Sequence, residues 1–271
     1  MIYRGAFHAH SKHSYDGQQP LPALCAELRR RGDHFLLLTE HDDTLDAAAY
    51  ERIRAECAAL SDAQFLAVPG LEIRCWRTER EQWHIAALGV GAWIPRGPIP
   101  EVVENIRRAG GLSVFLHPHK YSRQIELAEI ARFDGLELWN GKEDGHFAPR
   151  WRTLRLARAA AAHRTGPVLY CGHDLHDFDG IGPLALEIET DALTQAAVLS
   201  RLRDGNFMLR ARGFRFPAAR GPNALQSLGM LCWRGTYESY RALRRLPLVG
   251  GAVSAARRAW RPSDSGRRPE E

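Results

Sequence analysis

The chain has 271 residues, of which 45% are hydrophobic and 25% are charged, which is typical of one large globular domain or two small ones. This composition excludes intrinsic disorder over most of the chain, and no stretch approaches the ~20 uninterrupted apolar residues of a membrane span. The net charge of +5 is unevenly placed. Residues 1–212 carry 26 basic and 28 acidic side chains, whereas residues 213–271 carry 11 basic and 4 acidic ones.

The cysteine pattern argues against cross-linked folds. The five cysteines are odd in number, widely scattered and never arranged as Cys-x-x-Cys. Neither a disulfide framework nor a zinc ribbon is therefore expected, and a reducing cytoplasm suits these thiols. The N-terminal residues show no basic segment followed by an apolar run, so we expect no signal peptide. The predicted location is cytoplasmic, without a transmembrane segment.

Apolar runs along the chain predict strands that alternate with helices. Continuous apolar runs predict buried strands at residues 3–8, 35–39, 65–68, 84–90, 112–116, 135–139, 168–171 and 184–188. Helical patterns occupy residues 21–31, 45–60, 100–109, 125–132, 150–162 and 192–203. This alternation predicts an α/β fold with a parallel sheet and crossover helices. Seven or eight such units in about 210 residues favour a closed barrel, with a doubly wound open sheet as the alternative.

The pattern changes after residue 212. Arg, Pro, Gly and Ser then become frequent, a helical stretch covers residues 224–245, and residues 262–271 are expected to be disordered. We therefore predict one domain over residues 1–212 and a basic helical tail over residues 213–271.

Three interpretations of this tail stay open. Its apolar side chains recur at an approximately helical spacing, at Leu225, Leu228, Leu231, Tyr237, Tyr240 and Leu243. A helix packed on the exterior of the domain is the simplest interpretation. A peripheral contact with an anionic membrane and a contact with nucleic acid are the alternatives.

Histidines and carboxylates gather where the predicted strands end. His8 and His10 are two residues apart at the end of the first strand, a spacing that puts both imidazoles on one side of an extended chain. Similar residues follow in the segments Asp16-Gly17, Thr39-Glu40-His41-Asp42, Pro69-Gly70-Leu71-Glu72, His117-Pro118 and His173-Asp174-Leu175-His176. His84 differs because it begins its predicted strand. Since the C-terminal ends of parallel barrel strands converge, we expect these segments to meet on one face.

The chemistry of these side chains suits divalent metals. Imidazole and carboxylate ligands without thiolate favour Zn, Mn or Fe. Six histidines and three carboxylates are more than one ion needs, so two or three ions bridged by a carboxylate would use them all. Such a cluster can hold both ends of an in-line displacement at phosphorus.

Six motifs along residues 6–212 occur in the order of one known family. They are His8-Ala-His10-Ser-Lys-His-Ser-Tyr-Asp16-Gly17, Thr39-Glu40-His41-Asp42, Pro69-Gly70-Leu71-Glu72-Ile73, His84-Ile-Ala-Ala-Leu-Gly89, His117-Pro118 and Asp174-Leu-His176. With this set the sequence resembles the PHP (polymerase and histidinol phosphatase) superfamily of metal-dependent phosphoesterases. The resemblance implies a distorted seven-stranded (β/α) barrel, to which the basic tail is appended.

The resemblance also implies a site for two or three divalent ions, Mn, Zn or Fe. The implied metal ligands, through which catalysis would proceed, are His8, His10, Asp16, His41, Glu72, His84, His117, Asp174 and His176. Among these, Glu72 would bridge two of the ions.

Three features depart from the usual family pattern. Glu40 stands where Asp is usual, and its longer carboxylate is expected to retune His41. Tyr15 is an extra residue before Asp16, and His13 offers a competing ligand there. Only residues 91–111 separate the predicted fourth and fifth strands, where family members that act on nucleotides often carry a sizeable insertion. The nucleotide substrates of those family members are therefore not assigned directly to this chain.

The resemblance and the ligand chemistry predict a phosphoesterase. A water molecule whose pKa is lowered from about 15.7 to about 7 would attack phosphorus, so no nucleophilic side chain is required. Lys120 and Arg123, just after His117-Pro118, are the predicted contacts to the phosphate of a small metabolite or nucleotide. Two alternatives stay open: a metal-retaining module with a regulatory or binding role, and hydrolysis of a C–N bond at the same metal site.

Five further residues near strand ends allow two interpretations each. Glu137 and Asn140 would either contact substrate or support the structure. Trp76, Trp83 and Trp139 would either pack beneath the loops, which is the favoured interpretation, or form a stacking wall for a ring.

Overall fold

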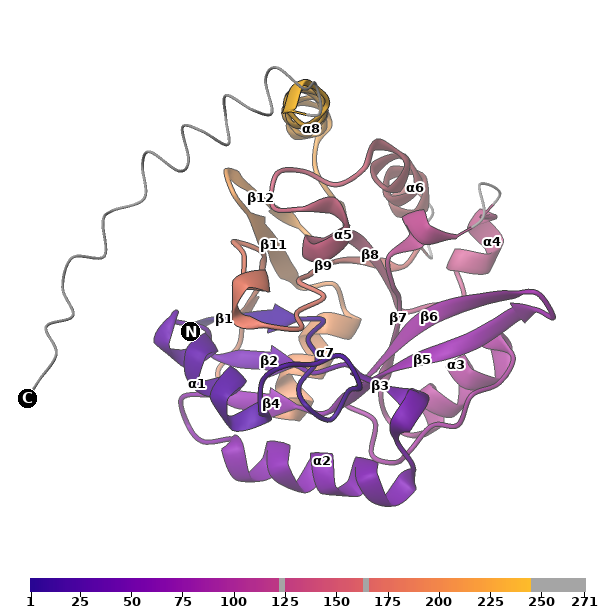
Figure 1. Ribbon diagram of the computed structural model, residues 1–271, viewed down its shortest axis with the longest axis vertical. Coiled ribbons are helices and arrows are strands. Elements are labelled where there is room, and N and C mark those ends of the chain that lie inside the picture. Colours follow the sequence, from indigo (N-terminus) through magenta and orange to yellow (C-terminus); the bar gives the residue numbers. More distant parts are fainter. Residues whose placement is uncertain (122–124, 163–165, 245–271) are drawn as a thin grey trace, which may run out of the picture.

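Two six-stranded sheets form the centre of the fold (Figure 1). The computed structural model describes residues 1–121, 125–162 and 166–244. Its strands are β1 (Ile2–Phe7), β2 (Phe35–Leu37), β3 (Glu40–His41), β4 (Leu66–Val68), β5 (Gly70–Thr78), β6 (Glu81–Leu88), β7 (Leu112–Phe115), β8 (Gly135–Asn140), β9 (Val168–Gly172), β10 (Ala185–Glu189), β11 (Phe207–Ala211) and β12 (Phe214–Pro217). One sheet has the order β12-β11-β10-β1-β2-β4, and the other has the order β3-β5-β6-β7-β8-β9.

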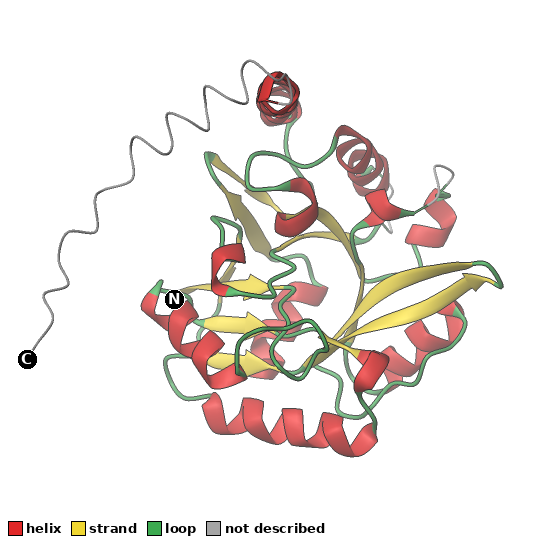
Figure 2. Ribbon diagram, in the orientation of Figure 1, coloured by secondary structure: helices red, strands yellow, loops and turns green. Residues whose placement is uncertain are grey.

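Helices surround the curved sheets (Figure 2). They are α1 (Leu21–Arg30), α2 (Ala47–Leu60), α3 (Ile99–Arg108), α4 (Leu127–Ile130), α5 (Gly141–Asp144), α6 (Trp151–Ala161), α7 (Gln195–Arg203) and α8 (Ala224–Arg244). The fold is therefore the mixed α/β class that the sequence predicts. No helix within the described residues is long and apolar enough to cross a bilayer.

Strand directions correct the expectation of an all-parallel sheet. β6 runs antiparallel to both β5 and β7, and β10 runs antiparallel to β1. Only residues 79–80 join β5 to β6, too short a link for the crossover helix that a parallel pair requires. The described residues form twelve strands, which are arranged in two sheets.

Four strands, β3, β5, β11 and β12, have no counterpart among the predicted apolar runs. β5 illustrates the reason, because Glu72, Arg74 and Arg77 interrupt its apolar pattern. The strand is nevertheless mostly buried from Gly70 to Cys75. A search for continuous apolar runs therefore misses a strand that carries charged side chains into the interior.

Large aromatic side chains fill the core beneath the strand ends. The rings of Trp83 and Phe115 stack with their centroids 4.4 Å apart, and both side chains are fully buried. Trp139 is also fully buried, and its indole N–H donates to the carbonyl oxygen of Gly145 at 2.8 Å. The packing interpretation is thus confirmed for Trp83 and Trp139, whereas Trp76 is 42% exposed.

The segment after residue 212 is closely joined to the rest of the chain. β12 pairs with β11 across that boundary, and α8 then packs through Ser227, Met230 and Arg234, all of which are buried. The prediction that the leucine face of this helix packs on the domain is wrong, because leucines such as Leu225 and Leu228 are exposed. Residues 245–271, with the predicted end of the helix and the predicted disordered end, lie outside the described residues.

The contacts of α8 explain why a different face packs. The Arg234 guanidinium donates to the carbonyl oxygens of Asp144 at 2.7 Å and Ala148 at 3.2 Å. The ring of Tyr237 stacks on Phe147 at 4.5 Å. The loop under the helix therefore presents backbone acceptors and a ring, which a donor and an aromatic side chain satisfy better than leucines do.

Replacing Arg234 by methionine should lower the free energy of unfolding by about 1–3 kcal/mol, because two buried carbonyl oxygens lose their donor. Urea denaturation of the purified protein measures this change. Arg241→Met, at an exposed position of the same helix, is the matched control and should change stability by less than about 0.5 kcal/mol. Equal midpoints for the two variants would contradict the assigned role of Arg234.

Candidate metal centre

The nine residues predicted as metal ligands lie together at one end of the strands. Eight of them form four overlapping groups, in each of which one ligand atom per residue lies within 4.8 Å of the others. The groups are His10 with His41 and His176, His8 with His10 and Glu72, His8 with His117 and Asp174, and Glu72 with His84 and His117. Asp16, the ninth, places its Oδ2 atom 2.9 Å from Nε2 of His176 and its Oδ1 atom 3.4 Å from Nε2 of His41.

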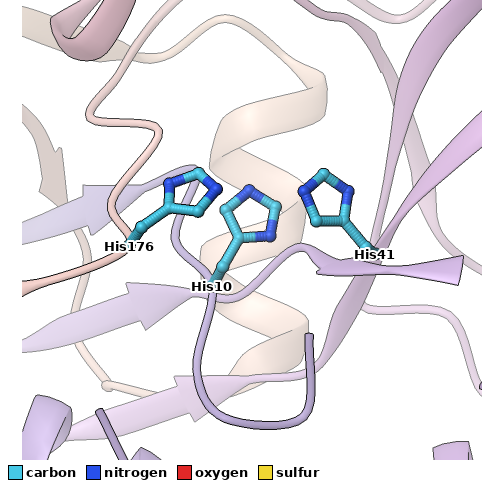
Figure 3. Close-up of side chains that lie close together, drawn as sticks. All are labelled: His10, His41 and His176. Carbon is cyan, nitrogen blue, oxygen red and sulfur yellow. The ribbon is translucent and has the colours of Figure 1, made fainter. Parts of the chain in front are cut away.

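Three of the imidazoles form one side of this cluster (Figure 3). The ring of His10 lies between those of His41 and His176. Its centroid is 4.2 Å from that of His41 and 4.5 Å from that of His176. Three segments that are distant in sequence thus contribute one compact group of nitrogen donors.

The carboxylate of Glu72 lies at the centre of the cluster. Its Oε2 atom is 3.0 Å from Nε2 of His8 and 3.2 Å from Nε2 of His10. Its Oε1 atom is 3.1 Å from Nε2 of His117 and also contacts Nδ1 of His84. The two oxygens therefore face two different pairs of imidazoles.

The direction of β6 explains how His84 reaches the cluster. His84 is the fourth residue of β6 and lies in the first half of the strand, whereas the sequence predicts that it begins the strand. Because β6 runs antiparallel to its neighbours, its first half lies beside the end of β7, and the backbone N–H of Leu116 donates to the carbonyl oxygen of His84 at 3.0 Å. In a parallel strand, a residue in the first half would lie away from the cluster. In the antiparallel β6, the same position brings His84 to the cluster.

Three residues of the cluster adopt left-handed backbone conformations. The φ angles of His8, His117 and Asp174 are 63°, 28° and 55°, and these are the non-glycine residues with positive φ in the described part of the chain. Such conformations cost about 1–3 kcal/mol each and persist where the surrounding structure enforces them. The rest of the fold therefore stabilises a strained backbone at these three residues, and this backbone directs their side chains into one group.

A buried glutamate supports the ligands from behind. Glu137 is 1% exposed, and its Oε1 atom accepts from Nδ1 of His8 at 2.8 Å. Its Oε2 atom accepts from the backbone N–H of His117 at 2.7 Å and from the Asn140 side chain at 3.1 Å. Protonation of His8 at Nδ1 leaves Nε2 available toward Glu72. Of the two interpretations of Glu137, its contacts favour support of the structure.

Glu40 acts on a loop and does not contact His41 directly. Its carboxylate accepts from the Ser11 hydroxyl at 2.5 Å and also from the Ser14 hydroxyl. Ser14 Oγ in turn accepts from the backbone N–H of His41 at 2.8 Å and lies 3.3 Å from Nδ1 of His10. Any effect of the longer side chain on His41 is therefore relayed by Ser14.

His13 does not compete for a place in the cluster. Its Nε2 atom lies 2.6 Å from the carboxylate of Glu56 on α2, and it belongs to none of the four groups. The extra residue Tyr15 is 61% exposed, and its ring stacks over His41 at 5.0 Å.

The environment favours ionised carboxylates and neutral imidazoles. Burial would raise the pKa of Glu72, but the adjacent imidazoles of His10, His117 and His8 lower it well below its usual range. Burial lowers the pKa of His10 and of His117, and it lowers the pKa of His41 to about 4. These are the protonation states that metal ligands require.

His8 is the exception among the imidazoles. Burial would lower its pKa, but the carboxylates of Glu137 and Asp174 raise it well above its usual value. A cation near Nε2 of His8 would be attracted by Glu72 and Asp174, which lie on that side of the ring, and would displace the proton.

Unpartnered atoms show that the donor set fits a metal. Among the described residues, His10 Nε2, Asp16 Oδ1 and His117 Nδ1 are buried and make no hydrogen bond. His10 Nε2 is within ion-pair distance of Glu72, yet the angles do not form a hydrogen bond. Buried polar atoms without partners are costly, and a divalent cation would satisfy them.

The two predicted phosphate contacts have different outcomes. The ammonium group of Lys120 pairs with the carboxylate of Glu143 at 2.6 Å, so its charge is already compensated. Arg123 lies outside the described residues. A third cation, Lys142 on α5, lies in none of the sequence motifs. The scarcity of lysine, with three among 37 basic side chains, is the one sequence signal that points to it.

Comparisons with known proteins support the resemblance at the level of fold. No family model matches the sequence, and no curated protein matches it. A solved two-domain protein from Bacteroides vulgatus ATCC 8482, which contains a predicted PHP-like metal-dependent phosphoesterase, matches 77% of this chain with a TM-score of 0.59 and 17% identity. This chain spans 64% of the length of that protein.

Two further solved structures match most of their own length. A candidate metal-dependent phosphoesterase from Bifidobacterium adolescentis ATCC 15703 is 17% identical, with a TM-score of 0.52 over 73% of this chain and 96% of that one. An amidohydrolase from Chromobacterium violaceum, with bound sulfate and no metal, is 16% identical, with a TM-score of 0.50 over 74% and 96% of the two chains. At these identities the likeness is one of fold.

Proposed function

We propose that the protein is a metal-dependent phosphoesterase. The observation that carries this proposal is the placement of Glu72, whose two oxygens each face a separate pair of imidazoles in a buried cluster. A carboxylate in this position is suited to bridge two cations, and paired cations suit an in-line displacement at phosphorus. The PHP-like fold of the structural neighbours supports the same reaction class.

The proposed site would hold two or three ions of Mn, Zn or Fe. Ligand atoms around Oε2 of Glu72 come from His8 and His10, and those around Oε1 come from His84 and His117. The group of His10, His41 and His176, with Asp16 beside it, offers a further position. Nitrogen and carboxylate donors without thiolate favour these metals. When bound, they would acidify a water molecule and neutralise charge on phosphoryl oxygens.

Neighbouring residues orient the proposed metal ligands. Glu137 orients His8 and the His117 backbone, and Ser14 orients His10 and His41. Supporting partners of this kind commonly contribute 10–100-fold to metal affinity or activity.

We further propose that seven strand positions form a PHP-type barrel. β2 and β3 are separated by two residues and β4 and β5 by one, so each pair can be counted as one interrupted strand. Backbone hydrogen bonds from His173 to Phe7 at 2.9 Å and from Leu175 to His8 at 3.1 Å link the segment after β9 to β1. These bonds support a ring of β1, β2/β3, β4/β5, β6, β7, β8 and β9.

Elemental analysis and a hydrolysis assay test the function. The protein purified without chelator should contain Zn, Mn or Fe and should hydrolyse p-nitrophenyl phosphate. Chelation should abolish the activity, and added Mn or Zn should restore it. A protein that contains none of these metals and hydrolyses no phosphate ester after Mn addition would refute the proposal. A screen of small phosphorylated metabolites and nucleotides then identifies the substrate class.

Hydrolysis of a C–N bond is the second candidate, because one of the structural neighbours is an amidohydrolase. The same metal-loaded protein distinguishes the two candidates when it is offered phosphate esters and simple amides in parallel. Release of amine without release of phosphate would favour the second candidate.

A further inference from the structure

Lysine is rare in this chain, and each occurrence lies near a residue of the proposed metal centre either in sequence or in space. The 37 basic side chains include only three lysines, Lys12, Lys120 and Lys142, and the rest are arginines. Lys12 lies two residues after His10, and Lys120 lies three residues after His117. Lys142 lies on α5, which directly follows β8.

Lys142 contacts the cluster itself. Its ammonium nitrogen is 3.2 Å from Nε2 and 3.4 Å from Nδ1 of His176, and 3.8 Å from Oδ1 of Asp174. The side chain is 48% exposed, so it can be reached from solvent. Lys120 differs, because the carboxylate of Glu143 already occupies its ammonium group at 2.6 Å.

The contacts of Lys142 would change when the cluster holds cations. The lone pair of His176 and the charge of Asp174 would then be directed to the metals. The ammonium group would lose both partners and stand beside like charges, a repulsive arrangement. An oxyanion placed between the metals and Lys142 would satisfy both.

A small pocket beside the cluster has room for such an anion. It has a volume of about 200 Å³, and its lining includes Lys142, His146, His173, Asp174 and His176. Nδ1 of His146 and Nδ1 of His173 are buried there without a hydrogen-bond partner. The pocket is smaller than the roughly 300 Å³ at which sites for whole ligands begin. It fits a phosphate group and the few atoms next to it.

We propose that Lys142 binds the phosphate group of the substrate in this pocket. This inference rests on the proposed phosphoesterase function and specifies the cation that recognises the anionic end of the substrate. It assigns to Lys142 the role that the sequence analysis gave to Lys120.

Chemical acetylation tests the contact without an activity assay. The metal-loaded protein is treated with limiting sulfosuccinimidyl acetate, with and without saturating inorganic phosphate, and mass spectrometry measures modification at each lysine. Phosphate should slow modification of Lys142 at least about fivefold, while Lys12 serves as the internal reference and should change less than about twofold. If calorimetry shows that phosphate binds but Lys142 is not protected, this inference fails and the proposed function stands. If phosphate does not bind and no phosphate ester is hydrolysed, both fail.

A substitution series provides the second test. Lys142→Ala should weaken phosphate binding to the metal-loaded protein by about 10–100-fold, the usual loss for a charged hydrogen bond, while metal content stays unchanged. Lys142→Arg should recover part of the affinity, and Lys12→Ala is the matched control. Unchanged phosphate affinity in Lys142→Ala, or loss of the metals from it, would overturn the assignment.

Discussion

Replacing Glu72 by glutamine should remove most of the bound metal and lower the hydrolysis of phosphate esters by more than about 100-fold. Loss of a supporting residue behind a metal ligand costs 10–100-fold, and loss of the central carboxylate should cost more. Glutamine keeps the volume of the side chain, so no cavity forms. It removes the negative charge toward which four imidazoles are directed. Elemental analysis of the purified variant and its turnover of p-nitrophenyl phosphate measure the two effects.

Glu129→Gln is the matched control for this substitution. Glu129 lies on α4 and pairs with Arg77 at 2.8 Å, away from the four ligand groups. Its substitution should leave metal content and turnover within about twofold of the parent protein, because Glu129 belongs to none of the four groups. A Glu72→Gln protein that retained its full metal content would refute the bridging role.

Introducing a methyl group at Gly172 should disrupt the site from beneath. A Cβ atom at this position would lie 2.3 Å from Oε1 of Glu137 and 2.7 Å from Cβ of His8. Oε1 is the atom that accepts from the His8 ring, so Gly172→Ala must displace either the carboxylate or the ligand. We expect a loss of about 3 kcal/mol in the free energy of unfolding and a loss of about 10–100-fold in turnover.

Denaturation curves and assays of the metal-loaded variant measure these changes. Gly235→Ala is the matched control, since a Cβ atom there meets nothing within 4 Å in the middle of α8. That control should raise stability by about 0.5–1 kcal/mol, because alanine favours a helix more than glycine does. Normal stability and normal turnover in Gly172→Ala would contradict the close packing of Glu137 and His8.

Elements with a strong local pattern were predictable. The helices α1, α2, α3 and α7 lie within a few residues of their predicted ranges, because a helix presents its apolar face through residues that are close in sequence. The strands with continuous apolar runs were predictable for a similar reason. β5 was missed because the glutamate and arginines that it carries mask the apolar alternation.

The residues of the cluster were predictable because their chemistry is visible in short motifs. The roles of Glu137 and Lys142 were not, because each depends on residues more than 30 positions away. Glu137 acts on His8, and Lys142 acts on Asp174 and His176. The position of His84 in the cluster was likewise not predictable from local sequence, because it depends on the direction of its strand.

The sequence by itself determined the residue types of the site, the α/β class and the absence of a pattern for membrane insertion. These properties follow from side-chain chemistry and from periodicity between neighbouring residues. Only the tertiary structure decided that β6 runs antiparallel, that α8 packs through Arg234, and that Lys120 pairs with Glu143 whereas Lys142 lies beside Asp174. Pairing between distant segments sets these features, and local patterns do not encode which distant partner is chosen.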